Sequence, residues 1–433
     1  MNSFWTTDIN KPHFKSLNGD TKTDILIVGG GITGILCAYM LEKAHINYML
    51  IEAKEICSGI TKNTTAKVTV QHGLIYDKII KKYGLEAAQK YYTANNNALN
   101  KYRELCREFD CNFEDKDAFV YSINDTDKII NEINAYNKIG VSAEFVKKTP
   151  LPFSVLGAVK LENQGQINPL ELLYKISKNL NIKENTKLQN LLPHCAETDK
   201  GKINFKKAII TTHFPIVNKH GSYFLKMYQH RSYVIAYENA QNVNGIYIDD
   251  NIKGFSFRNY GDLLLIGGGS HRTGKKGGNW AEISDFAKRY YPKANEKCRF
   301  ATQDCMTLDG IPYIGNYSKN TPDLFVATGF NKWGFTSAMA AADILCDLVQ
   351  EKQNEFCEVF SPSRTILHPQ LALNGAEAIF NLITPTVPRC PHLGCALKYN
   401  KHEHSWDCPC HGSRFTTEGK LIDNPATDDK NMH

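Results

Sequence analysis

The chain has 433 residues, of which 42% are hydrophobic and 22% charged, a composition typical of a globular protein with two or three folding units. Its 51 basic and 45 acidic residues leave a net charge of +6 that is spread along the chain, which argues against a nucleic-acid partner. The N-terminus lacks the apolar core of a secretory signal, and no run reaches the ~18 apolar residues of a membrane span, so we expect a cytoplasmic protein.

The first predicted elements, over residues 25–52, are a strand, a glycine-rich turn, a helix and a second strand. In such a motif the glycines permit a tight turn, let the backbone approach a pyrophosphate and let the helix pack closely on the strand. An acid that ends the second strand can accept hydrogen bonds from a ribose. The order of these features predicts a dinucleotide site, which the motif alone does not assign to NAD or FAD. The residues expected to form it are Gly29, Gly31, Gly34 and Glu52.

Three further features follow along the chain. Residues 76–108 have the pattern of amphipathic helices, and residues 221–270 are rich in strand-forming side chains. Residues 324–327 predict a strand, which is followed by Gly329, a short loop with Gly334 and an alanine-rich helix. The N-terminus of that helix can present backbone N–H groups to an anion.

Six segments resemble the D-amino-acid-oxidase/glycine-oxidase superfamily of FAD-dependent oxidoreductases. They span roughly residues 22 to 350 in the family's order and read DILIVGGGITGILCAYMLEK, IEAKEICSGIT, NQGQINPLELL, KAIITTHFP, LDGIPYIG and LFVATGFNKWGFTSAMAAADIL. The resemblance implies FAD and an α/β fold, in which a Rossmann-type FAD-binding domain (22–75, 160–220 and 300–355) is interleaved with an α+β substrate domain (76–159 and 221–299). The residues implied to bind FAD are Gly29, Gly31, Gly34, Glu52, Thr61, Thr65, Gly329, Gly334, Phe335 and Thr336.

Several polar residues lie where enzymes of this superfamily hold a substrate carboxylate or approach the flavin ring. Each of them, taken singly, has the alternative of an ordinary polar role at the surface or at a strand end. Cys305 lies near the expected flavin, but its register does not match the cysteines that attach flavin in some relatives, so we expect no covalent bond. The catalytic candidates are His271, Arg272, Arg231, Tyr233 and His72, with Arg258, Lys67 and Gln71 in the same segments.

The C-terminal part concentrates four of the chain's 13 cysteines in a short stretch. A Cys-x-His motif and a Cys-x-x-His motif bring two thiolates and two imidazoles from two loops. This donor set suits zinc, or a [2Fe–2S] cluster with two cysteines on one iron and two histidines on the other. A zinc finger has no need of the extra cysteines, Cys395 and Cys410. The expected metal ligands are Cys390, His392, Cys408 and His411.

The two loops, CPHLGC and CPCHGS, resemble the cluster loops of high-potential Rieske proteins. The resemblance implies a [2Fe–2S] cluster on the four ligands and a disulfide between Cys395 and Cys410. It also implies that Ser413 donates a hydrogen bond to a cluster sulfide, whereas Phe415 replaces a tyrosine that donates to a cysteine sulfur. One hydrogen bond fewer leaves the reduced cluster less stabilised, so we expect a redox potential below that of respiratory Rieske proteins.

The implied Rieske module, residues 384–433, is short for an all-β domain. A linker over 356–383 precedes it, and residues 371–383 of this linker have the pattern of a short amphipathic helix. Rieske domains usually place their cluster loops on a β-barrel base, and here the base is truncated. Either the flavin part of the chain supplies the missing support, or the module is only marginally stable.

The combination of the two parts resembles bacterial FAD-dependent oxidoreductases with a C-terminal Rieske domain. The segments that carry this resemblance are TTAKVTVQHGLIY, QDCMTLDGIPYIG and SWDCPCHGSRF. We therefore expect a small amine or amino-acid-like substrate, electron exchange between FAD and the cluster, and an external electron acceptor or donor. Two alternatives stay open at this point. One is a flavin oxidase that uses O₂ and carries a degenerate C-terminal appendage, and the other is a flavoprotein whose C-terminal part binds zinc as an interaction module.

Overall fold

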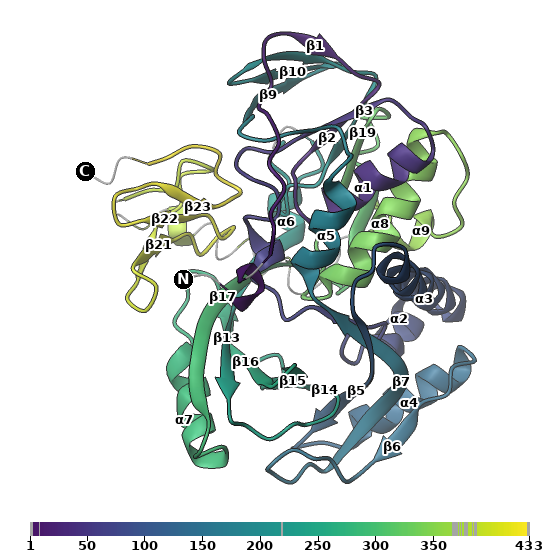
Figure 1. Cartoon of the computed structure of the whole chain (residues 1–433), viewed down its shortest axis with the longest axis vertical. Coiled ribbons are helices and arrows are strands. Elements are labelled where there is room, and N and C mark those ends of the chain that lie inside the picture. Colours follow the sequence, from purple (N-terminus) through teal and green to yellow (C-terminus); the bar gives the residue numbers. More distant parts are fainter. Residues whose placement is uncertain are drawn as a thin grey trace.

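The computed structural model describes residues 3–7, 9–217, 220–365 and 388–430, with positions 371, 373, 375, 380–382 and 384. The helix predicted over 371–383 lies mostly outside these described residues. Among the helices that are described, none has the length and apolar character needed to cross a membrane. Figure 1 shows one large sheet in the upper half of the molecule, another in the lower half, and a small C-terminal sheet at one side.

The upper sheet has six strands, and its central strands are parallel. Helices α1 (Ile32–Lys43), α5 (Pro169–Ser177) and α8 (Gly334–Val349) cover it. Because helices and loops bury the central strands on both faces, these strands are continuous apolar runs rather than alternating ones. In spatial order the strands are β18 (Tyr313–Asn316), β19 (Leu324–Thr328), β12 (Lys207–Ile210), β2 (Ile25–Val28), β3 (Tyr48–Ile51) and β8 (Ile182–Lys183).

The lower sheet has nine strands and is mostly antiparallel. Its helices are α2 (Tyr76–Tyr83), α3 (Leu85–Glu108), α4 (Asp127–Lys138) and α7 (Trp280–Tyr290). In spatial order the strands are β17 (Asn295–Thr307), β13 (Met227–Glu238), β16 (Leu263–Arg272), β15 (Ser256–Tyr260), β14 (Ile246–Asp249), β5 (Phe113–Ser122), β7 (Gly157–Ile167) and β4 (Lys67–Val68), with β6 (Glu144–Val146) paired to β7.

Two four-stranded sheets complete the described fold. One lies at the top of Figure 1 and contains β1 (Thr21–Lys22), β9 (Leu188–Leu192), β10 (Cys195–Thr198) and β11 (Gly201–Asn204). The other is the C-terminal sheet of β20 (Lys398–Asn400), β21 (Ser405–Asp407), β22 (Arg414–Thr416) and β23 (Leu421–Asp423). Short helical turns, η1 (Phe4–Thr6), η2 (Ile60–Lys62), α6 (Tyr223–Lys226) and α9 (Cys357–Phe360), connect larger elements.

A buried carboxylate, Glu132 of α4, fixes the start of α2. Its two oxygens accept hydrogen bonds from the backbone N–H groups of Tyr76, at 2.9 Å, and Asp77, at 3.0 Å. These donors have no partner within the helix, so a side chain from a neighbouring element satisfies them. Burial outweighs these hydrogen bonds and raises the pKa of Glu132 to about 7.

The raised pKa of Glu132 predicts that stability falls as pH rises. Its contribution is fully present below the unfolded pKa, near 4.5, and is lost as pH rises through about 7. The difference corresponds to about 3 kcal/mol in the free energy of unfolding. Denaturant unfolding of FAD-loaded wild type between pH 5 and 8 should therefore show a steeper loss of stability than Glu132→Gln, whose side chain does not ionise. Parallel pH profiles for the two proteins would contradict this assignment.

Candidate functional site

A cavity of about 1410 Å³ is lined by residues of both large sheets and of the C-terminal sheet. It extends from the glycine turn after β2 to the start of α8, and it reaches Glu403, Arg414 and Asp423 of the C-terminal part. Of the ten residues expected to bind FAD, eight line this cavity; they are Gly29, Gly31, Glu52, Thr61, Thr65, Gly329, Gly334 and Phe335.

The glycine turn has no room for side chains at its tightest points. A Cβ on Gly34 would lie 1.9 Å from the carbonyl oxygen of Gly29. Gly29 itself has a φ of +111°, which favours glycine. A Cβ on Gly31 would meet only Thr61 Oγ1, at 3.3 Å, on the cavity side. The turn therefore packs α1 tightly on β2 and leaves its backbone open to the cavity, which fits a pyrophosphate.

Glu52, which directly follows β3, lies beside this turn. Glu52 accepts hydrogen bonds from the N–H of Gly30, at 2.7 Å, and of Lys54, at 2.9 Å. Burial raises the pKa of this carboxyl group, and the two hydrogen bonds oppose that effect. The side chain is thus oriented by the backbone while it lines the cavity, as binding of a ribose would require.

The start of α8 forms another part of the cavity wall. His72 Nε2 lies 2.9 Å from Thr336 Oγ1, and its Nδ1 lies 2.7 Å from the hydroxyl of Tyr91. The imidazole stacks on Trp333 at a ring distance of 5.1 Å, and burial lowers its pKa to about 3. His72 is therefore neutral, and its hydrogen bonds join the loop before α2 to the first turn of α8.

The other catalytic candidates have different surroundings. Arg231 and Tyr233 line the cavity but direct their polar atoms to Glu403. Arg272 donates hydrogen bonds to the carbonyl oxygens of Pro409, at 3.3 Å, and Cys410, at 3.2 Å. His271 is buried and stacks on Tyr233 at a ring distance of 5.8 Å. Three of these four side chains therefore bind the C-terminal part of the chain. Arg231 and Tyr233 bind Glu403, and Arg272 binds the second cluster loop.

The two cysteine-histidine loops close in the same way. In the first, Cys390 N donates to Cys395 O at 2.8 Å and Gly394 N donates to Cys390 O at 2.9 Å. In the second, Cys408 N donates to Ser413 O at 2.8 Å and Gly412 N donates to Cys408 O at 2.9 Å. A disulfide between Cys395 and Cys410 joins the loops, as the resemblance to Rieske proteins implied.

The four expected ligands converge between these loops. Cys390 and Cys408 are buried, and Cys408 lowers the pKa of the Cys390 thiol through a hydrogen bond. The rings of His392 and His411 lie 5.0 Å apart, and Nδ1 of His411 is buried without a hydrogen-bond partner in the described structure. A buried nitrogen with no partner is costly unless it binds something, so two thiols and two imidazoles in this arrangement fit a [2Fe–2S] cluster.

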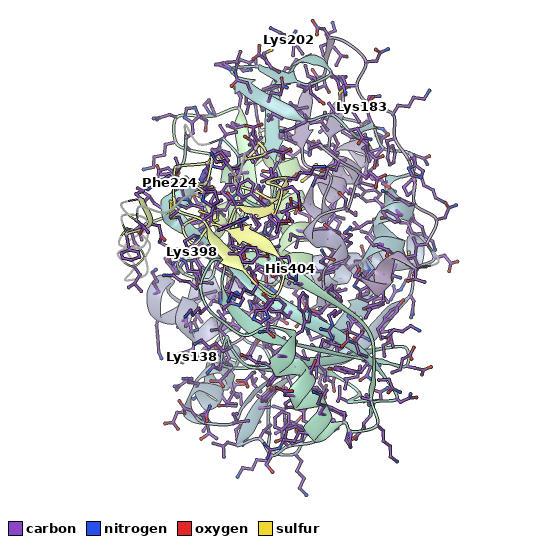
Figure 2. All side chains as sticks on the ribbon, turned by 90° about the vertical axis from the view of Figure 1, so that its left-hand side faces the viewer. Lys138, Lys183, Lys202, Phe224, Lys398 and His404 are labelled. Atoms are coloured by element: carbon purple, nitrogen blue, oxygen red, sulfur yellow. A yellow bond between two sulfur atoms is a disulfide. The ribbon has the colours of Figure 1, made fainter. Side chains whose placement is uncertain are left out.

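The main body of the chain contacts these loops directly. The ring of Phe214 lies 6.4 Å from that of His392, and the ring of Phe224 lies 6.0 Å from that of His411. Gly412 has a φ of +84°, and a Cβ there would lie 2.5 Å from Gln229. In Figure 2 the C-terminal strands lie across the body, between Phe224 and His404.

Glu403, in the turn between β20 and β21, joins the C-terminal sheet to the lower sheet. Its carboxylate forms ion pairs with Arg231 of β13 and, at 2.8 Å, with Arg414 of β22, and it accepts a hydrogen bond from Tyr233 at 3.0 Å. Burial alone would raise the pKa of Glu403, but the two guanidinium groups outweigh it and lower the pKa to about 2. Arg414 also pairs with Asp407 at 2.9 Å.

The core of the C-terminal module is small. Its four strands have three residues each, and the buried cluster contains little more than the four cysteines and three apolar side chains, which are Leu397, Phe415 and Ala426. Two further hydrogen bonds join the body to the module. The side chain of Gln303 donates to Gly412 O at 2.8 Å, and the side chain of Gln229 donates to Asn424 O at 3.0 Å. The body of the chain therefore supplies support that a larger domain would supply itself.

Comparison with known proteins identifies both parts. A family model described as FAD dependent oxidoreductase matches residues 24–348, and one described as Rieske [2Fe-2S] domain matches residues 381–432. The protein YhfW of Bacillus subtilis (strain 168), which carries the name of a Rieske 2Fe-2S iron-sulfur protein, is 34% identical over 490 residues, covering 98% of this chain and 96% of its own. The gamma-glutamylputrescine oxidoreductase of Escherichia coli (strain K12) is 23% identical over 227 residues, covering 48% of this chain and 53% of its own.

Solved structures share the fold of the larger part. Glycine oxidase from Geobacillus kaustophilus has a TM-score of 0.68 at 18% identity, covering 79% of this chain and 99% of its own. L-proline dehydrogenase from P. horikoshii has a TM-score of 0.66 at 17% identity, covering 80% of this chain and 98% of its own. At these identities the likeness shows the fold alone.

The chain belongs to the FAD dependent oxidoreductase family and carries a Rieske [2Fe-2S] domain at its C-terminal end. The comparisons thus confirm the predicted α/β fold with a small all-β module, the enzyme class, and FAD and a [2Fe–2S] cluster as cofactors.

Substitution of Arg231 tests how far the module depends on the body. Arg231→Met leaves Glu403 buried with one guanidinium partner fewer, which we expect to destabilise the docked module by about 3–5 kcal/mol. The iron content per chain should fall, and hydrogen exchange of residues 388–430 should rise.

Lys297→Met is the matched control, because it removes the exposed Lys297–Glu238 pair, at 2.8 Å, which joins β17 to β13, the strand of Arg231. We expect a change below about 1 kcal/mol there, with unchanged iron content. Equal iron content and equal exchange in the two variants would contradict the supporting role of Arg231.

Proposed function

We propose that the chain oxidises a small amine or amino-acid-like molecule in the cavity and exchanges electrons between its FAD and its Rieske cluster. An external electron acceptor or donor completes the reaction. The observation that carries this proposal is the segment that follows β12. Thr212 and His213 line the cavity, and the next residue, Phe214, contacts the ring of His392. The cavity wall and the cluster loops are therefore separated by very few residues.

The proposed FAD site combines the glycine turn with the start of α8. The close packing at the turn, the orientation of Glu52 and the placement of the helix N-terminus support assignment of all ten expected residues. Gly34 and Thr336 contribute through packing, since a Cβ on Gly34 would collide with the turn and Thr336 binds Thr69 O at 3.1 Å behind the cavity wall. The domain boundaries expected from the sequence remain part of this proposal.

Bound FAD supplies the redox chemistry, because it accepts two electrons from a substrate and exchanges electrons one at a time. The chain's own residues position the reactants and exclude water. His72 stays neutral and holds the first turn of α8 through Thr336. Arg272 fixes the second cluster loop by binding the carbonyl oxygens of Pro409 and Cys410.

The proposed cluster ligands are Cys390, His392, Cys408 and His411. Ser413 Oγ, at the end of the second loop, accepts a hydrogen bond from Ala426 N at 2.9 Å, which orients its hydroxyl group. Phe415 is fully buried within the core of the module and adds no hydrogen-bond donor. These surroundings support the expectation of a redox potential below that of respiratory Rieske proteins.

Anaerobic purification followed by spectroscopy and metal analysis tests the proposal. Wild type should show flavin absorption with broad iron–sulfur absorption and two irons per chain, and candidate amines or amino acids should bleach the flavin. Cys408→Ser should lose the iron and retain the FAD, because the two sites share no side chain.

Cys195→Ser is the control, since Cys195 is a free cysteine on β10, far in the sequence from the cluster loops. It should keep both cofactors. Flavin absorption with no iron, or with one zinc per chain, would overturn the proposed electron exchange and leave a flavin oxidase with a structural C-terminal part.

A further inference from the structure

At Gln303 the strand β17 lies between the cavity and the second cluster loop. Thr302 and Asp304 line the cavity, and Gln303, which lies between them in the strand, is fully buried. Because successive side chains of a strand point to opposite faces, Gln303 points away from the cavity and toward the C-terminal module. Its side chain donates a hydrogen bond to Gly412 O at 2.8 Å. Gly412 directly follows His411, one of the proposed cluster ligands.

The amide group of Gln303 is held in one orientation. Its oxygen accepts a hydrogen bond from Thr273 Oγ1 at 3.0 Å, so its nitrogen is the atom that faces Gly412. Thr273 is itself buried, and its backbone N–H donates to Gln229 O at 3.0 Å. Both ends of the amide group therefore have partners that match their donor and acceptor roles. The fold thus fixes the hydrogen bond from β17 to the cluster loop.

The face of β13 and β17 that receives the module contains three polar side chains. Gln229 and Arg231 alternate along β13, and Gln303 lies opposite Arg231. Arg231 binds Glu403, and Gln229 donates to Asn424 O at 3.0 Å, whereas Gln303 binds a residue beside a proposed ligand.

The second cluster loop approaches these strands closely. A Cβ on Gly412 would lie 2.5 Å from Gln229 Cβ, and the φ of Gly412 is +84°, which favours glycine. Any side chain at this position would move the loop away from β13 and lengthen the hydrogen bond from Gln303. The glycine therefore permits the contact that Gln303 makes.

Two routes lead from the cavity wall to the proposed ligands. One passes through Phe214, whose ring faces that of His392 across a non-bonded gap, with ring centres 6.4 Å apart. The other follows the backbone from Asp304 to Gln303 and crosses to the module through one hydrogen bond of 2.8 Å. Electron tunnelling falls off more steeply across a non-bonded gap than along covalent bonds and hydrogen bonds. The route through Gln303 therefore has the stronger coupling where it crosses to the module.

We propose that Gln303 is the bridging residue for electron exchange between the FAD and the cluster, and that its amide group couples the cavity wall to the cluster loop at Gly412. This inference rests on the proposed function and adds the route that its electrons take. Each step moves one electron between the flavin and the cluster, so that one is oxidised as the other is reduced. No bond of Gln303 or Gly412 forms or breaks, and a proton that the flavin gains or releases is exchanged with solvent.

Flash photoreduction of the enzyme loaded with FAD and iron tests the bridge without a substrate. A pulse of photogenerated 5-deazariboflavin radical delivers one electron, and absorbance then follows how fast the flavin and the cluster reach redox equilibrium. Gln303→Met keeps the length and shape of the side chain, but its thioether donates no hydrogen bond. The rate constant of equilibration should fall about tenfold, because a contact of about 3.5–4.0 Å replaces a hydrogen bond of 2.8 Å.

Gln229→Met is the matched control, because Gln229 is also a buried glutamine and its substitution also removes one hydrogen bond to the module. Its rate constant should stay within about twofold of the wild-type value. Hydrogen exchange of residues 388–430 should change equally in the two variants, since each loses one neutral hydrogen bond. A purely structural role of Gln303 would instead raise hydrogen exchange and leave the rate constant of iron-loaded molecules unchanged.

A second variant covers the case in which Gln303→Met does not retain iron. Thr273→Val removes the hydroxyl group that orients the amide of Gln303, and the side chain of Gln303 itself stays in place. The rate constant should then fall severalfold, and a wild-type rate constant in Thr273→Val would contradict the bridge.

The outcomes separate the two proposals. Wild-type protein that lacks FAD or iron, or that shows no exchange between them, overturns the proposed function. Protein whose cofactors exchange electrons, but in which Gln303→Met and Gln229→Met have equal rate constants, overturns only the bridge. The bridge is also overturned if Phe214→Leu slows the exchange more than Gln303→Met does, or if a changed midpoint potential accounts for the slower rate.

Discussion

The placement of the Rieske module depends on one buried carboxylate. Glu403 lies between Arg231 of the lower sheet and Arg414 of the C-terminal sheet, and all three side chains are less than a tenth exposed. A buried ion pair contributes little net stability compared with apolar packing, but removing one partner is strongly unfavourable. The network therefore fixes where the module lies more than it stabilises the fold as a whole. Its position sets the cluster loops against Phe214 and Phe224.

The same cavity wall then serves two purposes. It lines the cavity from the glycine turn to the start of α8, and the residues after β12 connect it to His392. The wall that lines the expected FAD site therefore also reaches the cluster loops. The small size of the C-terminal core is consistent with this arrangement, because the module need not be stable alone.

The sequence predicted the features that depend on local spacing. The glycine turn and the two cysteine-histidine loops are each contained in a few consecutive residues, and backbone geometry ties those residue types to those positions. The pairing of Arg231 and Tyr233 with Glu403 was not predicted, because Glu403 lies 172 and 170 positions away in the sequence. Such pairs depend on strand register, which a single sequence does not reveal.

The central claim is that the docked module exchanges electrons with the FAD of its own chain. Anaerobic stopped-flow mixing with substrate measures it most directly, by following reduction of the cluster after the flavin is reduced. We predict an observed first-order rate constant that does not change when the protein concentration is varied tenfold. An observed rate constant that rises in proportion to protein concentration would contradict the claim. It would mean that electrons pass between molecules rather than across the interface that Glu403 holds together.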